Sequence, residues 1–138
     1  MYYTYNFISI FLFLIPLLTS VNLECNEYII INFIWLTAGF VYHLSSFMNN
    51  YEVKGIVHLF RFIDMLSVHT LIPYIIYYST YNNYYYYTGI INVILLIAFY
   101  YFNLLVVNHN ILHVIASFGV YNAVNSCYLN KDTCHLCF

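Results

Sequence analysis

Residues 28–47 read YIIINFIWLTAGFVYHLSSF, twenty consecutive positions without a charged side chain. A helix of about 20 mainly apolar residues is long enough to cross the hydrocarbon core of a bilayer. This stretch therefore predicts a transmembrane helix. Its one ionisable imidazole, His43, lies near one end, and an ionisable group at membrane depth needs a partner or a function because its insertion costs free energy.

The composition of the whole chain agrees with that stretch. Of its 138 residues, 64% are hydrophobic and only 6% are charged, whereas soluble domains carry about 25% charged residues. We therefore expect an integral membrane protein that is embedded in the lipid bilayer. Three Lys plus Arg residues are too few to neutralise several phosphates, which excludes nucleic acid as a partner.

Four further apolar stretches have comparable length. We expect an all-α, polytopic transmembrane helix bundle of about five spans, which forms a single transmembrane domain over residues 1–138. The spans are predicted near 5–22, 28–47, 57–79, 88–107 and 109–126. A cleaved signal sequence is the alternative for the first span, but the lack of a positively charged start favours a retained helix.

The few charges predict how the chain is oriented. Lys54 and Arg61 lie at the junction of the second and third spans. Glu24 and Glu27 lie in the opposite loop. By the positive-inside rule the 48–56 loop is cytosolic, which gives a cytosolic N-terminus and an exoplasmic C-terminus.

The cysteines offer a separate prediction, because Cys25, Cys127, Cys134 and Cys137 all fall on the exoplasmic side of this topology. Four cysteines on an oxidising side can form two disulfides. The CHLC segment around His135 is also compatible with zinc binding or thiol exchange. A lone CxxC is a weak signal, so structural disulfides or free thiols are favoured.

Four polar residues stand out inside the apolar stretches. His109 and His113, in the segment HNILH, are one helical turn apart and share a helix face. With five spans, His43 and Asp64 fall at a similar depth beneath the cytosolic face. Three imidazoles leave a fourth position open, as a catalytic zinc ion requires, so His43, His109 and His113 are predicted to bind Zn²⁺.

Asp64 is predicted to be the catalytic carboxylate, which accepts a proton from water or orients that water by a hydrogen bond. A fourth metal ligand is the alternative role. Each residue also has a structural alternative: His43 lies at an interface, Asp64 pairs with Arg61 one turn earlier, and His109 caps its helix. Their joint occurrence at one depth favours the metal site.

The segments YHLSS (42–46), FRFIDML (60–66) and HNILH (109–113) occur in an order that resembles the CREST superfamily of membrane hydrolases. That superfamily includes alkaline ceramidases, progestin and adipoQ receptors and hemolysin III proteins. The resemblance implies a zinc ion held by three histidines and hydrolysis of a lipid amide or ester. The chain departs from the family in two ways: Gly39 replaces the family's Ser four residues before the first histidine, and five spans replace seven.

Two functions are therefore predicted. The first is a membrane-embedded, zinc-dependent hydrolase whose substrate is a membrane lipid, either active or degenerate. The alternative is a non-catalytic small membrane subunit of a larger assembly, with or without a haem held between two histidines such as His43 and His113. Both functions allow homo- or hetero-oligomers. A channel is disfavoured because the sequence contains no cluster of like charges.

Overall fold

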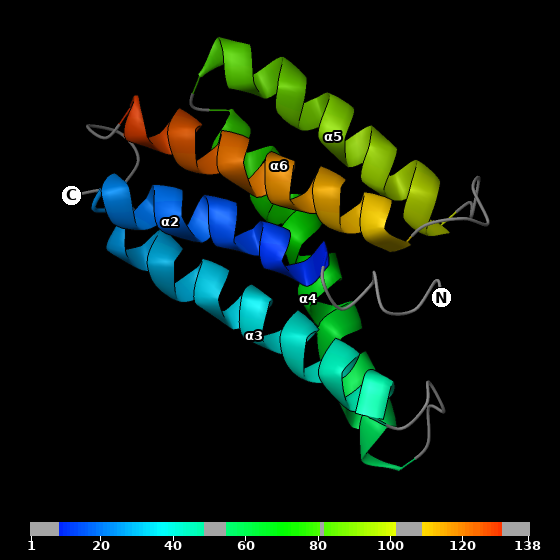
Figure 1. The fold of residues 1–138 in the computed structure, drawn as a ribbon. Helices are drawn as coiled ribbons and strands as arrows, with labels where there is room; N and C mark the ends of the chain where they lie inside the picture. The colour runs from blue at the N-terminus through cyan, green and yellow to red at the C-terminus, as the bar shows by residue number, and fades with distance from the viewer. Residues whose placement is uncertain (1–8, 49–54, 81, 102–108, 131–138) are drawn as a thin grey trace.

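The computed structural model describes residues 9–48, 55–80, 82–101 and 109–130, and these segments are almost entirely helical (Figure 1). The all-α prediction is confirmed for them. In chain order the elements are the 3₁₀ helix η1 (Ile10–Phe13) and the α-helices α2 (Leu14–Asn22), α3 (Asn26–Met48), α4 (Ile56–Ser79), α5 (Asn83–Tyr101) and α6 (His109–Tyr128).

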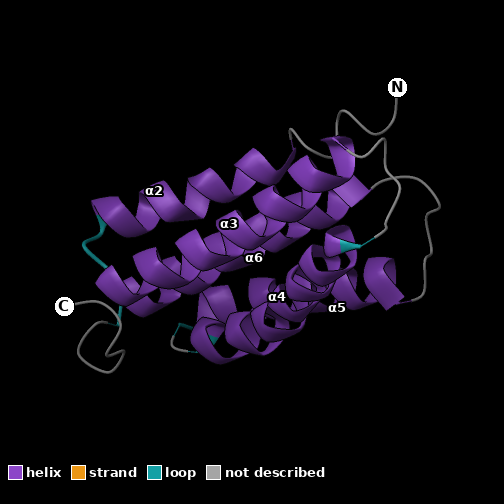
Figure 2. Cartoon of the chain, turned by 90° about the horizontal axis from the view of Figure 1, so that it is seen from below, coloured by secondary structure: helices purple, strands orange, loops and turns teal. Residues whose placement is uncertain are grey.

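Helix α6 lies at the centre of the bundle and packs against η1, α2, α4 and α5 (Figures 1 and 2). Most of its side chains are buried, including polar ones: His113, Ile115, Ala116, Ser117, Val120, Asn122, Ala123, Val124, Ser126 and Cys127. Gly119 permits the approach of α4, because a Cβ atom there would lie 2.6 Å from Cδ1 of Ile75. The neighbouring helices thus shield the polar groups of α6.

Successive helices run in opposite directions, so the bundle has two distinct ends. Met48, Ile56, Tyr101 and His109 are helix termini that lie toward one end, which we call the histidine end (right side of Figure 1). The opposite end contains the start of α3 and the close of α6, and we call it the cysteine end.

The cysteine end is tightly closed. Cys25 and Cys127 are fully buried, and both are disulfide-bonded, which confirms the disulfide prediction for these two residues; Cys134 and Cys137 lie outside the described residues. The Tyr28 hydroxyl donates a hydrogen bond of 3.3 Å to the carbonyl oxygen of Ala123. This bond joins α3 to α6 in the same region.

The outer surface of the bundle is strongly apolar. Large hydrophobic side chains are exposed along the outward faces of α3, α4 and α5, among them Ile30, Phe33, Ile34, Leu59, Phe62, Leu66, Ile91 and Ile94. Two helices in the described part of the chain, α3 and α4, are long and apolar enough to cross a membrane. Contiguous exposed apolar surface of this kind marks contact with lipid or with another protein.

The other three predicted spans differ from expectation in length or composition. The first, predicted at 5–22, is described only from residue 9, and its apolar helix at Ile10–Asn22 is shorter than the roughly 20 residues that a span needs. Helix α5 begins at Asn83 rather than at residue 88. There the side-chain oxygen of Asn82 accepts a 3.0 Å hydrogen bond from the backbone N–H of Tyr84, so the tyrosine run starts a helix.

Candidate metal and lipid site

Three helices contribute the predicted site residues at the histidine end. His43 is on α3, Asp64 on α4 and His113 on α6, and each histidine is only 7% exposed. His109 is the first residue of α6, one turn before His113, but its side chain lies outside the described part of the structure. The structure therefore tests the proximity of His43 and His113 only.

These two rings are in contact. The ring centroids of His43 and His113 are 5.0 Å apart, and the ring planes are nearly perpendicular at 83°. Two imidazoles in adjacent positions of a tetrahedral zinc ion, with Zn–N distances of about 2.0–2.1 Å, also have centroids about 5 Å apart. The spacing therefore fits two adjacent ligands of one metal ion.

His113 has a further partner that the sequence did not reveal. The hydroxyl oxygen of Ser9 lies 2.6 Å from Nδ1 of His113. When the ring N–H at Nδ1 donates to this oxygen, the lone pair of Nε2 is left for a metal. Metal-binding histidines usually hold their second nitrogen in such a bond. Ser9 is 104 positions away in the sequence, and a lone serine at the edge of an apolar stretch carries no signal of this contact.

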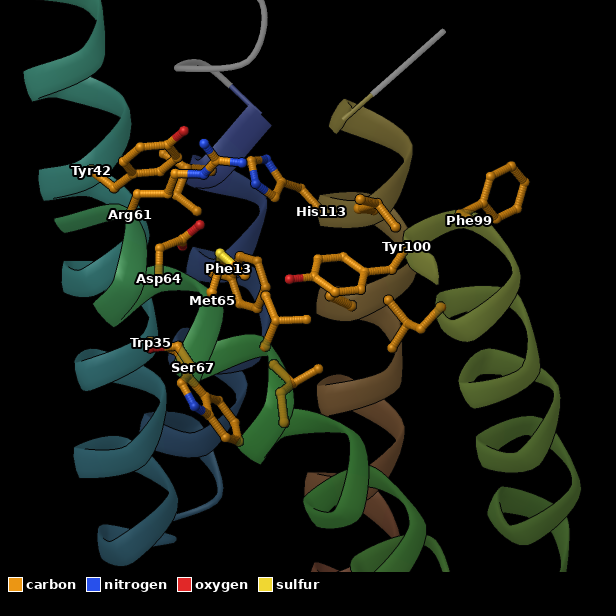
Figure 3. Close-up of a pocket in the computed structure, with 16 residues that line it drawn as sticks. Phe13, Trp35, Tyr42, Arg61, Asp64, Met65, Ser67, Phe99, Tyr100 and His113 are labelled. Carbon is orange, nitrogen blue, oxygen red and sulfur yellow. The ribbon is translucent and has the colours of Figure 1, made fainter. Parts of the chain in front are cut away.

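A cavity of about 520 Å³ opens beside His113, within the size range of small-molecule sites. Its walls come from η1 and from α3 to α6: Ile10, Phe13, Trp35, Tyr42, Arg61, Asp64, Met65, Ser67, Val68, Leu71, Leu96, Phe99, Tyr100, Leu112, His113 and Ala116. Figure 3 shows Tyr42, Arg61 and His113 toward one end, with Asp64 close by and Trp35 farther away. The charged and imidazole side chains of the wall therefore lie toward the histidine end, and the wall farther along is mostly apolar.

Asp64 lines this cavity. If its role were only structural, its carboxylate would be expected to form an ion pair with Arg61. Both Asp64 and Arg61 are described, and no ion pair joins them, although they lie one turn apart on α4. Asp64 is partly buried and shares the cavity wall with His113, which is compatible with the metal-site prediction. Asp64 is consequently placed to act on a group bound in the cavity.

Gly39 lies four residues before His43, where the pattern of the CREST superfamily has a serine. A Cβ atom at this position would collide with Cδ1 of Ile10 and would lie 3.5 Å from Oδ1 of Asp64. A serine there would therefore reach Asp64, but only after Ile10 moved. In this chain Ile10, a cavity-lining residue of η1, occupies the space of the missing side chain.

His58 and His69, the two histidines of α4, have other surroundings. Nδ1 of His69 lies 2.7 Å from the carbonyl oxygen of Met65, and its ring contacts Tyr100 at 5.7 Å between centroids. His58 is exposed near the start of α4. Neither residue lines the cavity, which agrees with their omission from the predicted site.

Within the described residues no group of three or more His, Cys, Asp or Glu side chains is arranged to hold a metal ion. His43 and His113 are two members of the predicted three-histidine set, and the third, His109, lies outside what can be compared. The chain matches no protein-family model, no curated protein and no solved structure. The resemblance to the CREST superfamily stays a prediction.

Proposed function

We propose that the chain is a multi-pass membrane protein in which α2 to α6 are all embedded in lipid. The exposed apolar faces of α3, α4 and α5 support this, because water would be a poor solvent for them. The hydropathy of α6 is lowered by its Asn, Ser and His residues. Most of these residues point into the bundle, so they do not oppose a membrane location.

The proposed orientation has the histidine end on the cytosolic side. Arg61 lies near that end, as the positive-inside rule requires. The disulfide-bonded Cys25 and Cys127 lie at the opposite end, where an oxidising compartment would keep their disulfides formed. Charge and cysteine chemistry thus support the same orientation independently.

The function that this site supports best is a zinc-dependent hydrolase of a lipid amide or ester. The observation that carries the proposal is the 5.0 Å, nearly perpendicular arrangement of His43 and His113, together with Asp64 in the adjoining cavity wall. The donor set fits zinc, since two buried imidazoles are already at ligand spacing. HNILH supplies a third imidazole one turn away.

In this proposal each residue has a distinct role. His43, His109 and His113 would hold the zinc ion, which when bound activates water and polarises a carbonyl group. Asp64 takes the proton of the attacking water and returns it to the leaving amine or alcohol. The apolar wall of the cavity binds the lipid chain and excludes water from it.

The alternative, a non-catalytic subunit with a haem between His43 and His113, is less well supported by the geometry. Axial haem ligands approach the iron from opposite faces. Their rings must therefore stand farther apart than two adjacent ligands of a tetrahedral ion. The 5.0 Å separation favours adjacent ligands.

The test is the metal content of detergent-purified protein, measured by elemental analysis for the wild type and two double variants. We expect near-stoichiometric zinc in the wild type and its loss in His43→Ala/His113→Ala. The matched control, His58→Ala/His69→Ala, also removes two imidazoles but should retain zinc. A folded wild type without zinc, or equal zinc loss in both variants, would contradict the proposal.

Hydrolysis is tested separately with Asp64→Asn. A panel of lipid amides and esters, including a fluorescent ceramide analogue, is first screened with the wild type. We then expect the variant to keep its zinc and lose turnover, because only the proton acceptor is removed. Unchanged turnover would exclude Asp64 as that acceptor.

A further inference from the structure

The cavity is chemically divided along its length. Arg61, Tyr42 and His113 lie toward the histidine end, and Trp35 lies farther along (Figure 3). Leu71 and Leu96, two nearly fully buried residues, also contribute to the wall. A ligand that matches this cavity has one polar end and one long apolar part.

Arg61 gives the polar end a definite charge. It is the only Lys or Arg among the described residues, and its side chain points toward His113 (Figure 3). No ion pair is formed between Arg61 and any carboxylate in the described segments. A guanidinium group binds carboxylate or phosphate through paired hydrogen bonds.

Asp64 does not cancel this preference. It lies three residues after Arg61 on α4, about one helical turn farther from the histidine end. An anionic group bound on the side of Arg61 that faces the histidine end would then lie about one helical turn from the carboxylate. The Asp64 carboxylate instead faces the part of the ligand just below the headgroup, where an amide or ester bond lies in most membrane lipids.

We propose that this cavity binds lipids with an anionic headgroup, which Arg61 recognises, while one acyl chain lies along Trp35, Leu71 and Leu96. This inference rests on the proposed function in that it names the substrate class of the same site. Arg61 is the residue that determines specificity. Neutral lipids with the same chain are expected to bind less tightly.

The protein carries its own probe for this proposal, because Trp35 is its single tryptophan and lines the cavity. Bromine atoms on an acyl chain quench tryptophan fluorescence on contact. We would titrate detergent-solubilised full-length protein with brominated lysophosphatidic acid and with the brominated monoacylglycerol of the same chain. Glycerol 3-phosphate, which has the phosphate but no chain, is the third probe.

The wild type should bind the lysophosphatidic acid about tenfold more tightly than the monoacylglycerol, as expected for one charge-assisted interaction. Arg61→Gln should abolish that difference and leave monoacylglycerol binding unchanged, and Arg61→Lys should restore part of it. Lys54→Gln, which removes the same charge seven positions earlier, should keep the full difference. Glycerol 3-phosphate should neither quench Trp35 nor displace the lipid at equal concentration.

Equal binding of the two lipids by the wild type would overturn the proposal, as would an unchanged preference in Arg61→Gln. Displacement by glycerol 3-phosphate alone would indicate a phosphate site without a lipid chain, which also contradicts it. All titrations are made with a chelator present and without turnover. The lipid-binding result can therefore be interpreted even if the protein is not a zinc hydrolase. Likewise, the zinc and turnover measurements can be interpreted even if Arg61 does not select anionic lipids.

Discussion

The two ends of the bundle differ in how tightly their side chains are packed. At the cysteine end Cys25, Tyr28 and Cys127 are completely buried, and both cysteines are disulfide-bonded. At the histidine end Arg61 is exposed, and a cavity of about 520 Å³ separates the helices. The packing that stabilises the fold is thus separated along the helix axes from the polar groups that are available for chemistry. Changes at one end should therefore affect stability, and changes at the other should affect binding.

The largest effect is expected from Cys25→Ser/Cys127→Ser. Removal of native disulfides from a small protein commonly costs about 2–5 kcal/mol of unfolding free energy, because the unfolded chain is no longer constrained. Denaturant unfolding in detergent measures this loss. Bound zinc at low temperature should be unchanged, and reduction of the wild type should reproduce the effect. Lost zinc in a folded variant would break the separation of the two ends.

Ser9→Ala tests the histidine end. Loss of a hydrogen bond that orients a metal ligand typically lowers metal affinity 10- to 100-fold, so zinc binding in competition with a chelator should weaken by about that factor. Ser9→Thr should restore affinity. The matched control is Thr19→Ala, whose hydroxyl donates only to the carbonyl oxygen of Ile15. Equal zinc affinity in Ser9→Ala and wild type would refute an orienting role.

Gly119→Ala tests the packing between α4 and α6 midway along the bundle. The added Cβ atom would lie 2.6 Å from Cδ1 of Ile75, and overpacking of this kind costs about 1–3 kcal/mol. Ile75→Val removes the colliding atom. The double variant should therefore be more stable than the sum of the single changes predicts, which a double-mutant cycle measures. Strict additivity would show that the collision is relieved elsewhere.

The smallest effect is expected from Tyr28→Phe, which removes the hydrogen bond to the carbonyl oxygen of Ala123. The unfolding free energy should fall by about 0.5–1.5 kcal/mol, with zinc affinity unchanged. Tyr84→Phe, at an exposed tyrosine, should have no measurable effect. A shift in zinc affinity in Tyr28→Phe would show that the two ends are coupled.

Helix positions were predictable where the chain is uniformly apolar. The predicted spans 28–47 and 57–79 match α3 and α4 to within two residues at each boundary, because both stretches are bounded by polar loop residues. The start of α5 was wrong by five residues. Hydropathy assigned its tyrosines to the loop, whereas capping by Asn82 begins the helix before them.

The site was predictable only in part, for a related reason. The depth of His43 and His113 follows from their positions within apolar stretches, and the structure brings those rings into contact. Ser9 and Ile10 could not be assigned to the site, because sequence periodicity does not reveal which faces of distant helices meet. The sequence indicates Arg61 as a topology signal and as an alternative ion-pair partner of Asp64, whereas its place in a cavity wall depends on how α4 to α6 pack.

The central, polar character of α6 has a consequence for how the protein is made. Insertion of a helix by the translocon depends largely on the hydrophobicity of its own side chains. A segment rich in Asn, Ser and His partitions poorly into lipid when it is alone. In the proposed multi-pass membrane protein, α6 would therefore be inserted together with α2, α4 and α5, which cover its polar groups. The contact between the rings of His43 and His113 would then form in the same step in which the bundle assembles during biosynthesis.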